Sequence, residues 1–202
     1  MIVADVETSG ISPSRNSILS IGALDFNNHK NQFYGECRVW DGAEISSEAL
    51  AINEFSQEEA LDPDKQTLEE LAHKFFVWTQ ECPEKTLAGQ NVSFDRDFLN
   101  DSFRRAKIDY RFAVRSVDLH SVCYADFLIH GTEPPLKNDH TDLDLDAIAN
   151  YVGMPSEPKP HNALNGAKYE AEAFNRLLYG KNLLEEFAEY PVVKAMQKLP
   201  KV

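Results

Sequence analysis

The sequence is short of cysteines, long apolar runs and a basic leader. Its three cysteines, Cys37, Cys82 and Cys123, lie far apart and no pair has the spacing of a metal knuckle, so we interpret them as reduced, buried thiols. No apolar run approaches the length of a membrane span. Met1 is followed by no basic leader and no apolar signal region. We therefore expect a cytoplasmic protein with no membrane attachment.

Positive charge is also scarce. Lysine and arginine total 20 against 33 aspartates and glutamates, which gives a formal net charge of -13. Proteins that grip long duplex nucleic acid are usually basic because phosphate contacts dominate their affinity. The balance argues against tight, processive binding to long polymers. It does not exclude a pocket for one chain end, because clustered carboxylates that hold divalent cations also make the count negative.

The chain length and composition suit a single globular domain. It has 202 residues, of which 43% are hydrophobic and 26% charged. Alternation and apolar runs predict an antiparallel hairpin beside the first strand, followed by alternating strands and helices. We therefore predict an α/β fold with a mixed sheet, antiparallel on one side and parallel on the other, flanked by helices. The predicted strands are 2–6, 17–26, 32–40, 86–92 and 114–120, and the predicted helices are 67–80, 93–106, 141–154 and one from His161 to just before Gly180.

Two carboxylates end the first predicted strand, in the segment DVETSG. Residues two apart on a strand share a face, so Asp5 and Glu7 project side by side. Most such pairs are simply solvated. A divalent cation would relieve their repulsion, and their hard oxygen atoms suit Mg²⁺ or Mn²⁺. Thr8, Ser9 and Gly10 then form a small polar turn that would let a substrate backbone come close.

A third acid follows the fourth predicted strand, in GQNVSFDRDFL. Asp95 lies in the first turn of a predicted helix, where it could merely stabilise the positive helix end. Alternatively, it faces Asp5 across neighbouring strand ends, where ligands gather in open α/β sheets. Asn91 either hydrogen-bonds a substrate or fixes the turn.

A histidine follows a proline-rich loop in KPHNALNGAKYEAEAF. His161 stands immediately before the last predicted helix. A lone histidine there is usually a surface or capping residue. Because imidazole titrates near neutral pH, His161 is also a candidate general base that takes a proton from water.

These three segments, in this order, resemble the motifs of the DEDDh 3'-5' exonuclease family: DVETSG the first, NVSFDRDFL the second and HNALNGA the third. ALAINEF, residues 49–55, resembles the segment between the first two. The resemblance spans about residues 1–180, which we expect to form an exonuclease domain. Residues 181–202 are expected to be a tail or a packed helix.

The resemblance implies a ribonuclease H-like fold and two Mg²⁺ or Mn²⁺ ions that assist hydrolysis of the 3'-terminal phosphodiester. Asp5 matches a ligand shared by both ions, Glu7 completes the shell of the first, and Asp95 supports the second. His161 matches the general base. The expected partners are 3' ends of single-stranded DNA or RNA, and nucleoside 5'-monophosphates are the expected products.

The pattern breaks where the third motif should carry an aspartate, at Gly166. The neighbouring Asn165 and, one helical turn later, Glu170 are candidate replacements, although a full turn of ~5.4 Å is a long reach. The function therefore stays open between an exonuclease with a weakened metal site and an impaired module that binds nucleic-acid ends or docks on a larger enzyme. The preference for DNA or RNA, the native status of Gly166, and a homodimer or polymerase-like partner also stay open.

Overall fold

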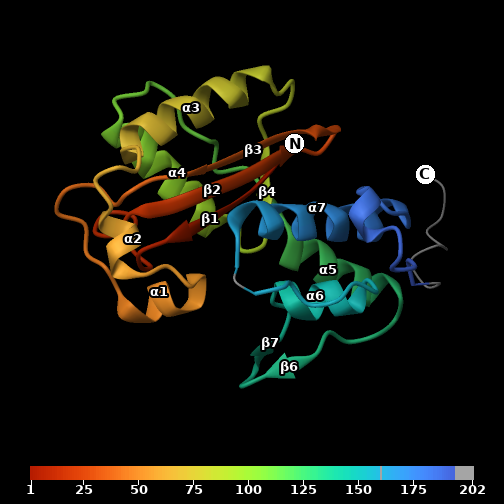
Figure 1. Cartoon of the computed structure of the whole chain (residues 1–202). Coiled ribbons are helices and arrows are strands. Elements are labelled where there is room, and N and C mark those ends of the chain that lie inside the picture. The colour runs from red at the N-terminus through yellow and green to blue at the C-terminus, as the bar shows by residue number, and fades with distance from the viewer. Residues whose placement is uncertain (160, 194–202) are drawn as a thin grey trace.

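The computed structural model describes residues 1–159 and 161–193, and its centre is a five-stranded mixed sheet. The strand order is β3-β2-β1-β4-β5, with β1, β2 and β3 antiparallel and β4 and β5 parallel to β1. Helices lie on both faces (Figure 1), as the sequence predicted. The strands are β1 Ile2–Thr8, β2 Ile18–Asp25, β3 Asn28–Glu36, β4 Leu87–Gly89 and β5 Val117–Asp118. The helices are α1 Ser47–Asn53, α2 Gln57–Leu61, α3 Leu68–Glu81, α4 Ser93–Arg105, α5 Leu119–Ile129, α6 Leu145–Tyr151 and α7 Ala163–Tyr179.

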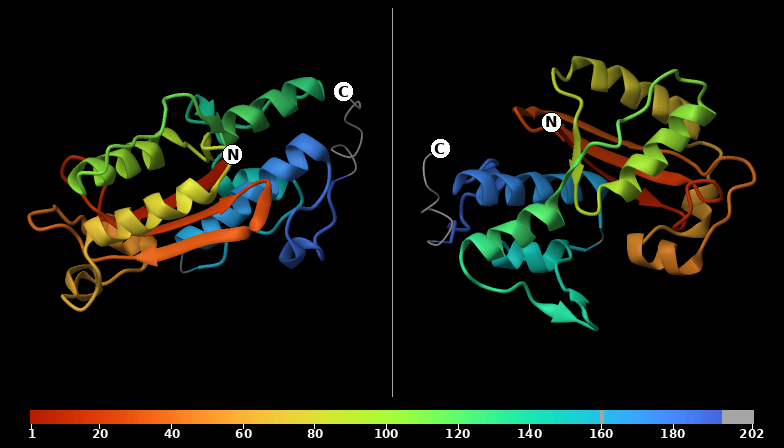
Figure 2. Two further views of the ribbon diagram at one scale, coloured as in Figure 1. Left: turned by 90° about the horizontal axis from the view of Figure 1, so that it is seen from above. Right: turned by 180° about the vertical axis from the view of Figure 1, so that it is seen from behind.

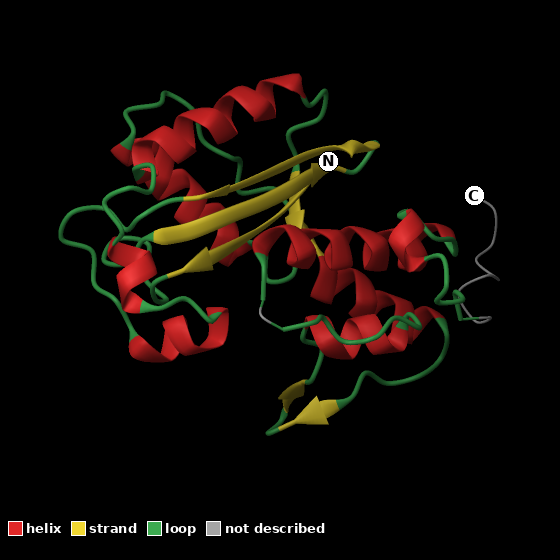
Figure 3. Ribbon diagram, viewed as in Figure 1, coloured by secondary structure: helices red, strands yellow, loops and turns green. Residues whose placement is uncertain are grey.

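The two faces of β1 serve different layers of the molecule. Ile2, Ala4 and Val6 point into a core formed with α3 and α4. Val3 points into the opposite core, formed with α5, α6 and α7. The layers are visible from above in Figure 2 and by element type in Figure 3. Because side chains alternate, the odd-numbered positions after Val3 lie on the α7 face.

The β2–β3 hairpin turns earlier than the sequence predicted. The predicted third strand, 32–40, lies four residues later than the observed β3 at both ends. Asp25 pairs with Asn28, and the Asn27 N–H donates to Asp25 Oδ1 at 3.0 Å. The turn-rich composition of NNHKN therefore indicated a turn, but most of this segment extends the strand.

Local capping rules placed α3 and the end of α7 correctly. Thr67 and Glu70 form the predicted capping box at the start of α3. Gly180 adopts φ 63° and ends α7, as predicted. The helices α1, α2 and α5 and the hairpin of β6 (Leu136–Lys137) and β7 (His140–Thr141) were not predicted. Each is short or weakly amphipathic, so periodicity carried little signal.

The strand β4 is shorter than the predicted 86–92 because side chains take over its hydrogen bonding. After Gly89, the Gln90 N–H donates to Glu170 Oε1 at 2.7 Å. The Val92 N–H donates to Asp118 Oδ2 at 3.3 Å. The chain thus leaves the sheet after Gly89 and enters α4 at Ser93. The carboxylate of Glu170, on α7, lies where the chain leaves the sheet.

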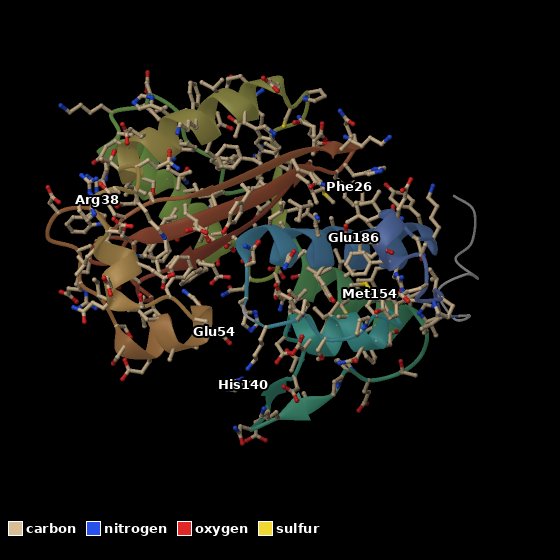
Figure 4. All side chains as sticks on the ribbon, viewed as in Figure 1. Phe26, Arg38, Glu54, His140, Met154 and Glu186 are labelled. Atoms are coloured by element: carbon tan, nitrogen blue, oxygen red, sulfur yellow. The ribbon has the colours of Figure 1, made fainter. Side chains whose placement is uncertain are left out.

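The segment after α7 returns along that helix. Leu184 and Phe187 are buried in the α5–α7 core, and a short 3₁₀ turn, Glu185–Phe187, lies between α7 and the end of the described chain. Figure 4 shows Glu186 over α7, where Lys168 Nζ donates to its Oε2 at 3.4 Å. The rest of the predicted tail, 194–202, lies outside the described residues. No helix in the described ranges is long and apolar enough to cross a membrane.

Candidate active site

The first- and second-motif acids meet at the C-terminal end of β1. Asp5 and Glu7 lie on the α7 face of that strand. Asp95 is 3% exposed in the first turn of α4, and its Oδ1 accepts a hydrogen bond from the Val6 N–H at 3.0 Å. The strand that carries Asp5 and Glu7 therefore holds Asp95 directly against itself. Of the two interpretations of Asp95 that the sequence left open, the structure has the one in which it lies beside the first-motif strand.

The third motif brings an imidazole and an unpredicted acid to the same place. The His161 Nδ1 lies 3.0 Å from Glu157 Oε2, and the other oxygen, Glu157 Oε1, is buried without a hydrogen-bond partner among the described residues. The charge of His161 opposes the rise in the pKa of Glu7, so the imidazole lies within electrostatic reach of the first motif. Glu157 lies in the proline-rich loop. It was missed because a four-residue spacing has no fixed geometry outside a helix.

The space that a side chain at position 166 would take is occupied by the Asp5 carboxylate of the first motif. A Cβ added at Gly166 would overlap Asp5 Oδ2. The glycine therefore lets the Asp5 carboxylate lie against the backbone of α7. A side chain at this position would require Asp5 to turn away.

Glu170, one helical turn further, reaches the strand ends. It is 2% exposed, and Oε1 accepts the Gln90 N–H bond. Its Oε2 is buried with no hydrogen-bond partner among the described residues and lies 3.3 Å from where a Gly89 Cβ would stand. Of the two candidate replacements, Glu170 is thus inside the acidic cluster. Asn165 is half-buried, and its role stays a prediction.

The crowding of acids is visible in their ionisation. Burial, followed by the charges of Glu170, Asp95 and Glu7, raises the pKa of Asp5 well above its usual range. Burial raises the pKa of Glu7 to about 7, with His161 opposing the rise and Glu157 adding to it. Burial also raises the pKa of Asp95 to about 8, opposed by the Val6 N–H. The cluster therefore resists full ionisation unless positive charge is supplied.

Burial raises the pKa of Glu170 well above its usual value too, and Asp95 is the leading charge that adds to the rise. The same cause, burial, raises the pKa of Glu157, while its bond to His161 opposes the rise. Each of these acids therefore lies within electrostatic reach of the first two motifs.

The turn after β1 is held by its own polar groups. The Thr8 Oγ1 donates to Gly10 O at 2.8 Å. The Ser9 hydroxyl donates to Glu44 O at 2.9 Å and accepts from the Ser17 N–H at 2.9 Å. Gly10 leaves no space for a Cβ, which would overlap the Asn16 side chain. These bonds shape the turn, and its contact with a substrate stays a prediction.

Two asparagines fix the backbone on either side of the acids. Asn91 adopts φ 53°, and its carbonyl accepts from the Phe94 N–H at 2.9 Å, so it does fix the turn into α4. Its side chain is exposed, and a bond to substrate stays a prediction. Asn53, at the end of α1, donates from Nδ2 to Thr8 O at 2.9 Å and joins α1 to the end of β1.

The donor chemistry of the cluster fits a hard divalent cation. All its acids offer oxygen atoms, and Glu170 and Glu157 each have a buried oxygen with no hydrogen-bond partner among the residues described. In the described ranges no three His, Cys, Asp or Glu side chains already stand at the spacing of a closed metal site. Binding an ion would therefore require carboxylates to turn toward it. A cavity of about 840 Å³ near Pro13 and Arg104 lies outside this cluster.

The fold and this cluster together define a ribonuclease H-like nuclease architecture, and the comparisons identify the family. An exonuclease family model, RNase_T, matches residues 2–174. The chain belongs to this exonuclease family, of the DEDDh 3'-5' type.

Curated relatives support the assignment. Ribonuclease T of Marinobacter nauticus is 29% identical over 119 residues, 53% of this chain and 54% of the relative. The 3'-5' DNA exonuclease Cap18 of Escherichia coli is 28% identical over 182 residues, covering 86% and 88%. The PolC-type DNA polymerase III of Streptococcus suis is 25% identical over 154 residues, covering 74% of this chain and 10% of that protein. The chain thus spans about half of the first relative and a tenth of the polymerase.

Solved structures share the fold. E. coli exonuclease I in complex with a 5cy-dA13 oligonucleotide has a TM-score of 0.71 at 19% identity, covering 89% of this chain and 40% of that one. The nuclease domain of 3'hExo, a DEDDh family member bound to rAMP, has a TM-score of 0.65 at 17% identity, covering 96% and 95%. The similarity extends over nearly the whole described chain, so the fold is shared along almost its full length.

Proposed function

We propose that this protein is a metal-dependent 3'-5' exonuclease that removes nucleoside 5'-monophosphates from single-stranded nucleic acid. The observation that carries the proposal is the convergence of Asp5, Glu7 and Asp95 at the C-terminal end of β1, with His161 within electrostatic reach. The oligonucleotide bound to exonuclease I and the rAMP bound to the 3'hExo nuclease domain support a nucleic-acid end as the ligand.

Asp5, Glu7 and Asp95 would hold two Mg²⁺ or Mn²⁺ ions. When bound, such ions neutralise the phosphate and make water a better nucleophile near neutral pH. His161 accepts the proton as the water oxygen attacks the terminal phosphorus. The bond from phosphorus to the 3'-oxygen breaks, that oxygen takes a proton from solvent, and the shortened strand ends in a 3'-hydroxyl.

Glu157 acts through His161 in this proposal. Its bond to Nδ1 leaves Nε2 as the nitrogen that receives the proton. A carboxylate in this position also stabilises the imidazolium formed by the transfer. We therefore assign Glu157 as a positioning residue.

The test is a digestion assay on 3'- and 5'-labelled single-stranded DNA and RNA with Mg²⁺ or Mn²⁺, with Asp5→Ala as the inactive reference. Stepwise, metal-dependent loss of 3' nucleotides is expected. A circular single strand should resist, because it has no end.

The rival function is a catalytically impaired module that binds nucleic-acid ends or docks on a larger enzyme. The break at Gly166 favours this rival, as does the match to a tenth of a polymerase. Binding of a labelled 3' end without metal-dependent shortening would establish it in place of the enzyme.

A further inference from the structure

Glu170 has a buried carboxylate oxygen whose location calls for a cation. The side chain is 2% exposed, Oε1 is held by the Gln90 N–H at 2.7 Å, and Oε2 has no hydrogen-bond partner among the described residues. A buried carboxylate oxygen with no partner is costly. Folding tolerates it where a bound ligand will supply the missing interaction.

The surroundings of Glu170 limit what that ligand can be. Its Oε2 lies over Gly89, at the strand next to the one that carries Asp5, and Asp5 and Asp95 are its electrostatic neighbours. An anionic or neutral ligand would add to the repulsion or leave it unchanged. A divalent cation bound by oxygen atoms would satisfy all three carboxylates.

Gly166 makes it possible for the Asp5 carboxylate to approach α7. With no side chain there, the Asp5 carboxylate lies against α7, one turn from Glu170 on the same helix. The glutamate side chain is long enough to span that turn, and the Gln90 N–H already holds its carboxylate at the strand ends.

We propose that Glu170 is the fourth carboxylate of the metal site and replaces the acid missing at position 166. This inference rests on the proposed function and deepens it by naming the ligand set: Asp5, Glu7, Asp95 and Glu170. In this ligand set Oε2, the oxygen without a hydrogen-bond partner among the described residues, would contact the ion, and Oε1 accepts the Gln90 N–H bond.

The test is calorimetric titration of the metal-free protein with Mn²⁺, with free Mn²⁺ counted by electron paramagnetic resonance. Glu170→Gln keeps an oxygen for the Gln90 bond but removes the charge. We expect its Mn²⁺ affinity to fall at least about tenfold. Asp97→Asn is the matched control, because Asp97 is an exposed acid on α4 two residues from Asp95, and its affinity should stay within about twofold of the wild type.

Unchanged Mn²⁺ affinity in Glu170→Gln would overturn the inference, as would an equal loss in Asp97→Asn. Should Glu170→Gln fail to fold by circular dichroism, Glu170→Asp shortens the reach, and unchanged affinity in that variant overturns the inference.

The titration also separates this inference from the proposed function. A wild-type chain that binds Mn²⁺ but shortens no labelled strand contradicts the exonuclease proposal. The Mn²⁺ affinity of Glu170→Gln then still decides whether Glu170 is a ligand. A wild-type chain that takes up no Mn²⁺ overturns the metal site and the role of Glu170 together.

Discussion

Two buried glutamates on α7, two residues apart, have opposite surroundings. Glu172 is fully buried: Oε1 accepts from Arg176 Nε at 2.8 Å, and Oε2 accepts the N–H groups of Leu183 and Leu184 at 2.8 and 2.9 Å. Glu170 is almost as buried, yet among the described residues only one of its oxygens has a hydrogen-bond partner. Both oxygens of Glu172 have hydrogen-bond partners within the fold, whereas Oε2 of Glu170 would gain its partner from the proposed metal ion. Two almost equally buried acids therefore differ in how many hydrogen bonds the fold gives them.

The largest effect is expected from a substitution of Glu172, the glutamate whose two oxygens both have hydrogen-bond partners. Glu172→Gln leaves the buried Arg176 guanidinium without its counter-charge, and we expect a loss of about 3–5 kcal/mol in the free energy of unfolding. Urea denaturation of the metal-free proteins measures it. Glu170→Gln is the matched control, since it makes the same chemical change on the same helix. Its stability at pH 8 should be equal to or above that of the wild type, because burial and the neighbouring Asp95 disfavour the ionised carboxylate that the substitution removes. Equal losses in the two variants would contradict the comparison.

The next effect concerns Glu157. Like Glu170, it has one carboxylate oxygen with a hydrogen-bond partner and one without among the described residues, but its partner is a histidine. Glu157→Gln should lower kcat about 10- to 100-fold, because the amide orients His161 without stabilising its charged form. The Michaelis constant should stay nearly unchanged, since Glu157 acts through His161. Steady-state kinetics on a short single-stranded oligonucleotide separate the two parameters. A variant that changes only the Michaelis constant would place Glu157 in substrate binding instead.

A smaller effect is the pH dependence of the metal-free chain. The folded pKa values of about 7 for Glu7 and about 8 for Asp95 exceed the unfolded values of about 4.3 and 3.9. Between about pH 4 and pH 8 the folded state thus binds more protons than the unfolded state, so the free energy of unfolding falls as pH rises. We expect the metal-free protein to be about 1–2 kcal/mol more stable at pH 6 than at pH 8.

Thermal unfolding at the two pH values checks this, with Asp95→Asn as the control in which the difference should shrink. Added Mn²⁺ should restore stability at pH 8. A metal-free chain that is more stable at pH 8 would show that the acids are already compensated within the fold.

The smallest effect is expected at Gly166. Gly166→Ala gains about 1 kcal/mol of helix propensity but forces Asp5 to turn away, so the net change in stability should stay within about 1 kcal/mol. Mn²⁺ binding should weaken nonetheless, because the Asp5 carboxylate is displaced. Denaturation and Mn²⁺ titration of the one variant test both halves. A stability loss well above this range would mean that Asp5 has no alternative rotamer.

Much of the architecture and the core of the site could be read from residue patterns. Alternation along β1 predicted that Asp5 and Glu7 share a face, and the ends of neighbouring strands were one of two expected places for Asp95. Glu157 could not be found in this way, because its contact with His161 depends on the path of a loop. Glu170 could be named only as a candidate, since its reach depends on how closely α7 lies on the sheet.

That closeness has its own physical origin. A Cβ at Gly22 would overlap the backbone of Ala163 and Leu164, so the start of α7 lies directly on β2. Strand and helix patterns give the identity of each element but not the separation between them. The close approach of α7 to the sheet that Gly22 allows therefore could not be predicted from the sequence.

The Arg176 guanidinium has a practical consequence for anyone shortening this protein. Besides Glu172 it donates to the carbonyls of Val152, Phe187 and Tyr190, at 3.0, 3.2 and 2.8 Å. A truncation at Gly180 would strip two of these acceptors and uncover apolar surface, inviting aggregation during expression. A design that ends after residue 193 keeps all of these carbonyl acceptors.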